Sequence, residues 1–240
     1  MKKITIITGG SKGVGKELAK EFLLKGENVC IIARTKTELE KTRNELSNMT
    51  SNDVIAYVGD VSDENFVKRF YAEISKKYDI TCLVNNAGVG RFASIYDNNK
   101  KMIDDIFPGI VYGTILMTTY ALPYLKQNKD ISKVVNIISQ SGRRTYKNES
   151  VYCAAKWAQE GYSQCLRSET FGTNVKVVNV YPGGINSGFW NASRDYVNVD
   201  VQKTFASTEE VAKIIVDNLY NKDSLILKDI VFEQKHMNLE

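Results

Sequence analysis

Tyr152 and Lys156 are the pair of residues whose types and spacing point most directly to chemistry. Residues four apart on a helix lie on one face, about one turn from each other. A free phenol titrates near pH ~10 and a free lysine near ~10.4, so neither alone performs acid–base work at neutral pH. A neighbouring ammonium lowers the pKa of a tyrosine because it favours the phenolate. The pair is therefore a candidate for protonating a carbonyl oxygen or deprotonating an alcohol.

Ser139 adds a hydroxyl group upstream of this pair. It ends the apolar run 134–138, which predicts a buried strand. Because Tyr-x-x-x-Lys spacings also occur on solvated helix faces, the alternative is that Tyr152 and Lys156 are ordinary surface residues. The segments that must position the three side chains decide between these interpretations.

Short apolar runs alternate with segments of helical periodicity along the whole chain. The expected strands are residues 3–8, 28–33, 53–58, 80–84, 133–138, 174–181 and 229–232. The expected helices are residues 16–25, 37–46, 63–77, 101–126, 150–171 and 208–220. This alternation, without an internal linker or repeat, predicts one α/β domain over residues 1–240 with a doubly wound parallel sheet. Ligands of such folds bind at the carboxyl ends of the strands, where all the candidate residues fall.

A glycine-rich turn lies between the first expected strand and helix. Glycines allow close approach of the backbone to an anion, and the following helix N-terminus presents free N–H groups and a positive dipole. The strand–turn–helix setting makes this a phosphate-binding turn. Its candidate residues are Gly9, Ser11, Lys12, Gly13, Val14 and Gly15.

Composition excludes several other classes of protein. The 240 residues are 43% hydrophobic and 25% charged, and the net charge of +4 is spread along the chain, so it favours neither nucleic acid nor membrane partners. We expect no membrane-spanning run and no signal peptide, and hence a cytoplasmic protein. The four cysteines lack metal-site spacing and are expected in the core. With a single histidine, His236, neither a His-based triad nor a His-rich metal site is expected.

In this order and spacing, the motifs resemble the classical short-chain dehydrogenase/reductase family over nearly the whole chain. The matching segments are Thr8–Gly15, Asn85–Gly88, the trio Ser139, Tyr152 and Lys156, and Tyr181–Ser187. The resemblance implies a Rossmann-type sheet of about seven strands and hydride transfer between a nicotinamide and a carbonyl or secondary alcohol.

The family roles transfer to this chain residue by residue. Tyr152 would be the general acid or base, Lys156 would lower its pKa and hold the nicotinamide ribose, and Ser139 would orient the substrate oxygen. Asp60 and Val61 would contact adenine. The other implied cofactor contacts are Asn86, Ala87, Gly88, Pro182, Gly183, Ile185 and Ser187.

The end of the second strand bears on the choice of nicotinamide. NAD-preferring members carry an acidic residue where this chain has Ala33, and Arg34 follows it. Arg34, with Lys12 and the Thr35 hydroxyl, could hold a 2′-phosphate, which predicts NADP(H) rather than NAD(H). The alternative is that Arg34 is a solvated loop charge.

One position departs from the family pattern. The asparagine that usually completes a catalytic tetrad is replaced by Ile110, shortly after Pro108 and Gly109. We hypothesise that Pro108–Gly109 supplies the helix bend credited to that asparagine, so that a backbone carbonyl still holds the relay water. The alternative is a broken proton relay, and hence a slow enzyme or a non-catalytic NADP(H) sensor.

The stretch 186–207 is expected to be the substrate lid. Its aromatic residues, with other residues near strand ends, suit a small apolar ketone or aldehyde, or else simply pack the lid. These candidates are Phe189, Trp190, Tyr196, Phe205, Arg91, Phe92, Arg143 and Tyr146. In the family the two long helices pair across a two-fold axis, which implies a homodimer or homotetramer. Their apolar residues include Ile115, Met117, Trp157 and Leu166.

Overall fold

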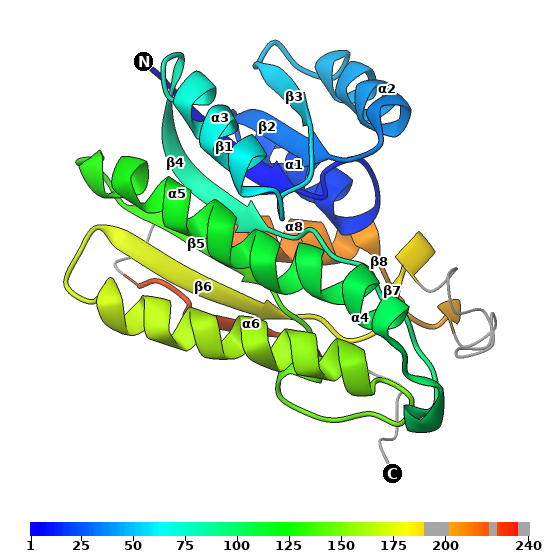
Figure 1. The fold of residues 1–240 in the computed structure, drawn as a ribbon. Coiled ribbons are helices and arrows are strands. Elements are labelled where there is room, and N and C mark those ends of the chain that lie inside the picture. The colour runs from blue at the N-terminus through cyan, green and yellow to red at the C-terminus, as the bar shows by residue number, and fades with distance from the viewer. Residues whose placement is uncertain (190–201, 221–224, 235–240) are drawn as a thin grey trace.

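The computed structural model describes residues 1–189, 202–220 and 225–234, and its centre is a seven-stranded parallel sheet (Figure 1). In spatial order the strands are β3 (Val54–Val58), β2 (Asn28–Ala33), β1 (Lys2–Thr8), β4 (Tyr78–Asn85), β5 (Ser132–Ile137), β6 (Val175–Tyr181) and β9 (Asp229–Val231). The strand order reverses between β1 and β4, which confirms the predicted doubly wound Rossmann-type fold. A small parallel pair, β7 (Ile185–Asn186) with β8 (Ala206–Ser207), lies beside it.

Helices cover both faces of the sheet. They are α1 (Gly13–Leu24), α2 (Lys36–Ser47), α3 (Glu64–Ile74), α4 (Lys100–Phe107), α5 (Gly113–Gln127), α6 (Ser150–Glu169) and α8 (Thr208–Leu219), with short turns η1 (Ile95–Asp97), η2 (Pro108–Tyr112) and η3 (Gln140–Gly142). Buried side chains of α1, α2 and α8 form one core cluster with the strands. Those of α3, α5 and α6 form the other, so the sheet is a buried middle layer.

Two helices differ from the sequence-based expectation. The first begins at Gly13 rather than at residue 16, because the glycine-rich turn passes directly into the first helical turn. The expected helix 101–126 is divided into α4 and α5 by a π-helical turn, η2, in which the Gly113 amide donates to the Pro108 carbonyl. Helical periodicity predicts the apolar face of such a segment, but one inserted residue leaves little trace in that pattern.

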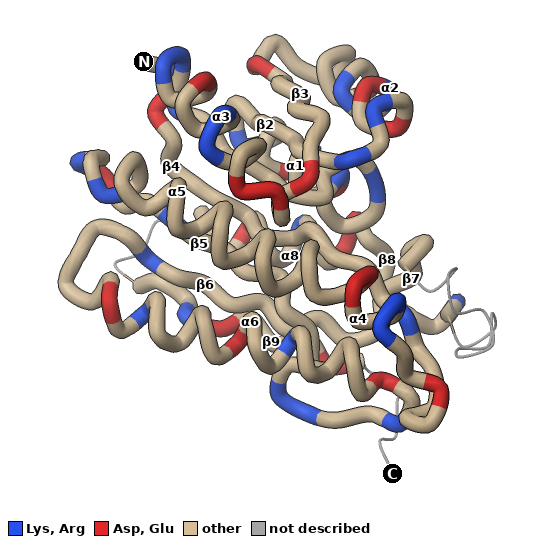
Figure 2. The backbone as a smooth tube through the Cα atoms, viewed as in Figure 1, with Lys and Arg blue, Asp and Glu red and all other residues tan. Residues whose placement is uncertain are grey.

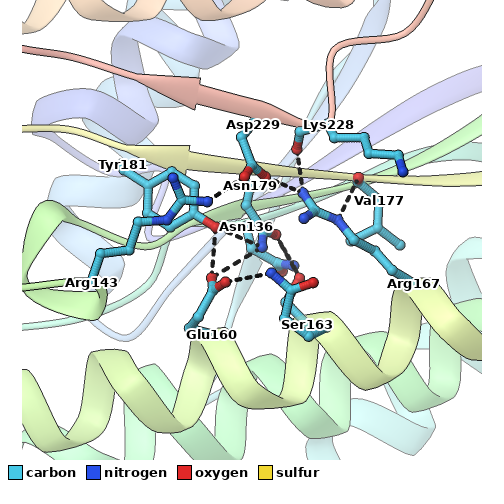
Figure 3. Close-up of polar contacts among 11 residues, drawn as sticks. Asn136, Arg143, Glu160, Ser163, Arg167, Val177, Asn179, Tyr181, Lys228 and Asp229 are labelled. Carbon is cyan, nitrogen blue, oxygen red and sulfur yellow. Dashed lines mark hydrogen bonds and ion pairs between the residues drawn. The ribbon is translucent and has the colours of Figure 1, made fainter.

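A row of polar side chains crosses the sheet at one level. Asn85, Asn136, Asn179 and Asp229 occupy matching register positions on β4, β5, β6 and β9. The Asn85 amide donates to the Asn136 side-chain oxygen at 2.9 Å, and that of Asn136 donates to Asn179 at 3.3 Å. The Ser163 hydroxyl of α6 connects the helix to this row by donating to the same Asn179 oxygen at 2.5 Å. Hydrogen bonds offset the cost of burying these amides, and they fix α6 relative to the sheet (Figure 3).

The row continues into a cluster around Tyr181. The Tyr181 hydroxyl donates to the Glu160 carboxylate of α6 at 2.7 Å. The Arg143 guanidinium stacks 3.6 Å from the centre of the Tyr181 ring and pairs with Asp229, as does Arg167 (Figure 3). Arg143, expected near the substrate, is therefore held against β6 and β9 instead, because an aromatic face and a carboxylate satisfy it there.

The sequence-based expectation that no apolar run approaches the length of a membrane-spanning helix is wrong for the stretch Lys100–Gln127. By length and composition this stretch could cross a membrane, since an 18-residue window has a mean hydropathy of 1.3. In the fold it packs against the sheet, with Met117, Ala121 and Leu125 fully buried. Figure 2 shows few charges along α5, and charges of both signs interspersed over the rest of the described chain.

Three of the four cysteines are buried as expected, but Cys165 is exposed. It lies on α6 one position before the buried Leu166, so the rotation of that helix against the sheet decides its exposure.

Candidate active site

A large cavity of about 1400 Å³ opens at the carboxyl edge of the sheet. It exceeds the ~300–1,000 Å³ typical of a site for one small ligand. The loops after β1 to β6 and two side chains of α6 line it. All the residues expected from the sequence to bind cofactor or perform chemistry are in its lining, namely Gly9, Ser11, Lys12, Gly13, Val14, Gly15, Arg34, Thr35, Asp60, Val61, Asn86, Ala87, Gly88, Ser139, Tyr152, Lys156, Pro182, Gly183, Ile185 and Ser187.

The glycine-rich turn has the geometry of an anion cradle. Gly9 and Gly13 have positive φ angles of 66° and 55°, which side chains rarely adopt. A Cβ at Gly15 would lie 2.3 Å from the Gly9 carbonyl oxygen, so only glycine fits there. No side chain caps the N-terminus of α1, whose first N–H groups are therefore available to a phosphate. This cradle fits the dinucleotide expected from the sequence.

Asn86 ties the loop after β4 to the glycine-rich turn. Its side-chain amide donates to the carbonyl oxygens of Thr8 and Gly9 at 2.9 and 3.2 Å. In return, the Thr8 hydroxyl accepts from the backbone amides of Asn86 and Ala87, each at 3.0 Å. Four hydrogen bonds thus hold the two loops together at the switch point, where a ligand of this fold class binds.

Burial shifts the pKa values of Tyr152 and Lys156 in opposite directions. It raises the pKa of the Tyr152 phenol, with a further rise from the Glu149 carboxylate and an opposing hydrogen bond with Ser139. Burial lowers the pKa of Lys156 to about 7. The Lys156 Nζ lies 5.8 Å from the centre of the Tyr152 ring. The expectation that the Tyr152 pKa is lowered is therefore wrong for this structure: the pKa is raised, and desolvation of the phenol is the largest cause.

Glu149 is a neighbour of the site that sequence reasoning missed. The residue is buried, lines the cavity, and its carboxylate accepts a hydrogen bond from the Ser141 hydroxyl at 2.8 Å. Ser141 in turn donates its backbone amide to the Ser139 hydroxyl oxygen at 3.1 Å. The only signal in the sequence is an acidic residue just before the helix that carries Tyr152.

The far end of the cavity holds two exposed cations. Arg34 is 66% exposed and lies 3.7 Å from Asp60, and Lys12 is 75% exposed and lies 3.6 Å from Glu38. No side chain caps the N-terminus of α2 at Thr35. Loose, solvated ion pairs contribute little to stability, so both cations can turn toward a ligand at low cost.

Two aromatic rings lie beside the Tyr152 ring. The Phe92 and Phe189 rings each lie 5.6 Å from the Tyr152 ring and 6.1 Å from each other. Phe189 lines the cavity, as do Phe205, Tyr146 and Arg91. Arg91 is paired with Asp105 at 3.5 Å. Trp190 and Tyr196, the other expected lid aromatics, lie outside the described residues.

Ile110 lies within the π-helical turn η2. Its side chain is fully buried and packs in one cluster with Val151, Tyr152 and Ala155. The expected departure from a regular helix is therefore present at Pro108, where a proline and a π turn coincide. The Ile110 side chain is apolar and forms no hydrogen bond with the site. That a backbone carbonyl of this turn holds a water of the proton relay stays a prediction.

The fold, the phosphate cradle and the placement of Ser139, Tyr152 and Lys156 define a dinucleotide-binding oxidoreductase. A family model described as short chain dehydrogenase matches residues 3–220, and the chain belongs to that family of NAD(P)-dependent dehydrogenases and reductases. Sepiapterin reductase of Chlorobaculum tepidum is 28% identical over 240 residues, with 96% of each chain covered. The NADP-dependent 3-hydroxy acid dehydrogenase of Schizosaccharomyces pombe is 28% identical over 245 residues, covering 98% of this chain and 93% of that protein.

Solved structures agree on the fold. The alcohol dehydrogenase of the archaeon Thermococcus sibiricus, complexed with 5-hydroxy-NADP, superimposes with a TM-score of 0.89 at 21% identity. The match covers 100% of both chains, so the two proteins share this fold.

Proposed function

We propose that the protein is an NADP(H)-dependent oxidoreductase that interconverts a carbonyl and a secondary alcohol of a small substrate, with Tyr152 as general acid and base. The observation that carries this proposal is that Ser139, Tyr152 and Lys156 line the same cavity as the phosphate cradle. A bound nicotinamide would supply the hydride chemistry.

Each of the three side chains has a distinct task. The Ser139 hydroxyl holds the substrate oxygen by a hydrogen bond and aligns it with the phenol. The Tyr152 hydroxyl gives its proton to that oxygen during reduction and takes it back during oxidation. The phenol is protonated at neutral pH, the state required for reduction, and burial raises its pKa further. When charged, Lys156 favours the phenolate that the proton transfer leaves behind.

The expected loss of activity in Tyr152→Phe tests this assignment. Ketones, aldehydes and alcohols would be screened by following the absorbance of the reduced nicotinamide. General acid–base catalysis typically contributes ~10²–10⁴-fold, so we expect a loss of that size in kcat with cofactor affinity retained. Unchanged activity in Tyr152→Phe would remove the mechanism.

The NADP(H) preference is supported by Arg34 and Lys12, which flank the end of the cavity next to β2, and by the name of the yeast relative. We expect kcat/KM to be higher with NADPH than with NADH. Charge-assisted pairs to phosphate typically contribute ~1.5–3 kcal/mol, so Arg34→Ala should lower kcat/KM for NADPH about 10- to 100-fold and leave the NADH value unchanged. Lys36→Ala, on the adjacent surface of α2, is the control. A preference for NADH in the unaltered protein would contradict the proposal.

The aromatic rings around Tyr152 favour a small substrate with apolar groups beside its carbonyl. The second candidate is a non-catalytic NADP(H)-binding sensor, which the apolar Ile110 at the tetrad position favours. The sensor would bind NADPH but turn over no member of the substrate panel. A sensor role does not explain why Ser139, Tyr152 and Lys156 lie together in the cavity.

We also propose a homodimer or homotetramer formed through α4, α5 and α6. Ile103, Tyr112 and Trp157 are exposed apolar residues on η2 and these helices. Met117 and Leu166, named from the sequence for the same contact, are buried within the chain and therefore belong to its own core.

A further inference from the structure

The amine of Lys156 is held by a side chain that no motif identifies. Nζ donates to the Ile137 carbonyl oxygen and to Oε1 of Gln159, both at 2.9 Å. The Gln159 amide nitrogen donates to the Thr114 hydroxyl at 2.9 Å. Lys156, Gln159 and Thr114 are all buried, so these hydrogen bonds are shielded from water.

The orientation of the Gln159 amide follows from the chemistry of its partner. An ammonium group only donates hydrogen bonds, so the amide oxygen must face Lys156 and the NH₂ group must face Thr114. Thr114 in turn must present a lone pair to that NH₂ group. The contact therefore favours the protonated amine over the neutral one, because a charged donor forms the stronger hydrogen bond.

This chain of contacts joins α6 to α5, the helix that follows the π turn containing Ile110. Gln159 lies on α6 one turn after Lys156, and Thr114 is the second residue of α5, immediately after the π turn. Ile110, in that turn, packs only apolar atoms toward α6. The side-chain support of Lys156 thus comes from Gln159, which Thr114 holds in turn, and not from the residue at the tetrad position.

We propose that Gln159, held by Thr114, is a positioning residue that keeps the Lys156 amine protonated and directed at the cofactor and Tyr152. This inference rests on the proposed function for its catalytic meaning, but the contact itself does not. Three donors are available on an ammonium, and the described residues accept two of them, which leaves the third for a hydroxyl group of a bound ligand.

The contact with Gln159 matters because the surroundings of Lys156 otherwise disfavour its charged form. Burial opposes its protonation. Tyr152, with its ring centre 5.8 Å from Nζ, is a titratable neighbour, and the Glu149 carboxylate acts in turn on Tyr152. Other titratable groups line the same cavity, among them Tyr146, Lys147 and Asp105, which pairs with Arg91 and Lys101. No carboxylate among the described residues pairs with Lys156, so a neutral amide oxygen is its main side-chain support.

The experiment is an NMR titration of the protein labelled with [ε-¹³C]lysine, without cofactor. The Lys156 signal is identified by its loss in Lys156→Met. Gln159→Leu should lower the pKa of Lys156 by about one unit, because a charged donor loses its acceptor. Gln159→Glu should raise it by about one unit or more, and Thr114→Val should lower it less than Gln159→Leu does. Gln164→Leu, the same substitution on the exposed side of α6, is the control.

Activity gives a second measurement once a carbonyl substrate is found. Gln159→Leu should lose about tenfold in kcat at pH 8 and much less at pH 6, where the amine stays charged, whereas Gln164→Leu should not change the profile. A Lys156 pKa within about 0.2 unit of the original in Gln159→Glu and Thr114→Val would overturn the inference, even if Gln159→Leu does not fold. If the titration behaves as expected but no substrate is turned over, the proposed function fails and the positioning role stands.

Discussion

At the scale of single residues, the proposed chemistry depends on Lys156, whose charged form is disfavoured by burial. Burial lowers the pKa of Lys156 and raises that of Tyr152, so the two groups tend toward their neutral forms. A neutral phenol is the right starting state for protonating a carbonyl. In the proposed mechanism a charged lysine stabilises the phenolate as the proton leaves, and the contacts to Ile137 and Gln159 favour that charged form.

The cost of burying Lys156 should appear as a pH dependence of stability. The amine titrates at about 7 in the folded chain, against an ordinary value of 10.5. Between pH ~7 and ~10.5 the unfolded chain binds more protons than the folded chain, so the free energy of unfolding rises with pH. Below pH ~7 the amine is protonated in both the folded and the unfolded chain, and burial of the charged amine then destabilises the fold most. From pH 7 to 9, the unfolding free energy should rise by about 2 kcal/mol more in the unaltered protein than in Lys156→Met.

Urea unfolding at several pH values measures this difference. Lys77→Met, at an exposed lysine after α3, should follow the unaltered protein. Parallel curves for the unaltered protein and Lys156→Met would show that the amine is not titrating in this range.

At the scale of elements, the unusual feature is the π turn between α4 and α5. Pro108 begins it, and Ile110 fills the space against Val151, Tyr152 and Gly88. A Cβ on Gly88 would lie 2.9 Å from the Ile110 side chain, so the two residues fit together closely. Apolar packing has thus taken the place of an amide at the tetrad position.

Restoring that amide should therefore cost stability without adding activity. We expect Ile110→Asn to lower the unfolding free energy by about 2–4 kcal/mol, since it removes buried methyl groups and buries a polar group. Ile110→Val should cost about 0.5–1.5 kcal/mol. Urea midpoints and carbonyl reduction rates would be measured together. A several-fold gain in kcat for Ile110→Asn would instead show that the relay is impaired in the natural sequence.

At the scale of the whole molecule, the parallel sheet brings the residues of the site to one edge, and a row of polar side chains connects four of its strands. Six strand ends contribute to one cavity, and the row from Asn85 to Asp229 fixes β4, β5, β6 and β9 at the level just below it. The edge strand β9 is held in the same way, because its Asp229 pairs with both Arg143 and Arg167. A rigid base of this kind supports precise positioning of Ser139.

Assembly is tested at the same scale. Trp157, 50% exposed on α6, should lie in the proposed contact between copies, so Trp157→Glu should shift the mass measured by light scattering toward the monomer. Leu24→Glu, at an exposed leucine of α1 on the other face of the sheet, should leave the mass unchanged. A stable monomer of the unaltered protein would refute the assembly.

The sequence by itself determined the order of strands and helices, the phosphate-binding turn, and the meeting of Ser139, Tyr152 and Lys156. These follow locally, because apolar periodicity places each element and parallel strands bring their carboxyl ends to one edge. Tertiary structure alone decided the support of Lys156 by Gln159, the burial of Glu149 near Tyr152, the docking of Arg143 on Tyr181, and the exposure of Cys165. Each of these depends on how helices and loops pack against the sheet, which side-chain spacing along the chain does not encode.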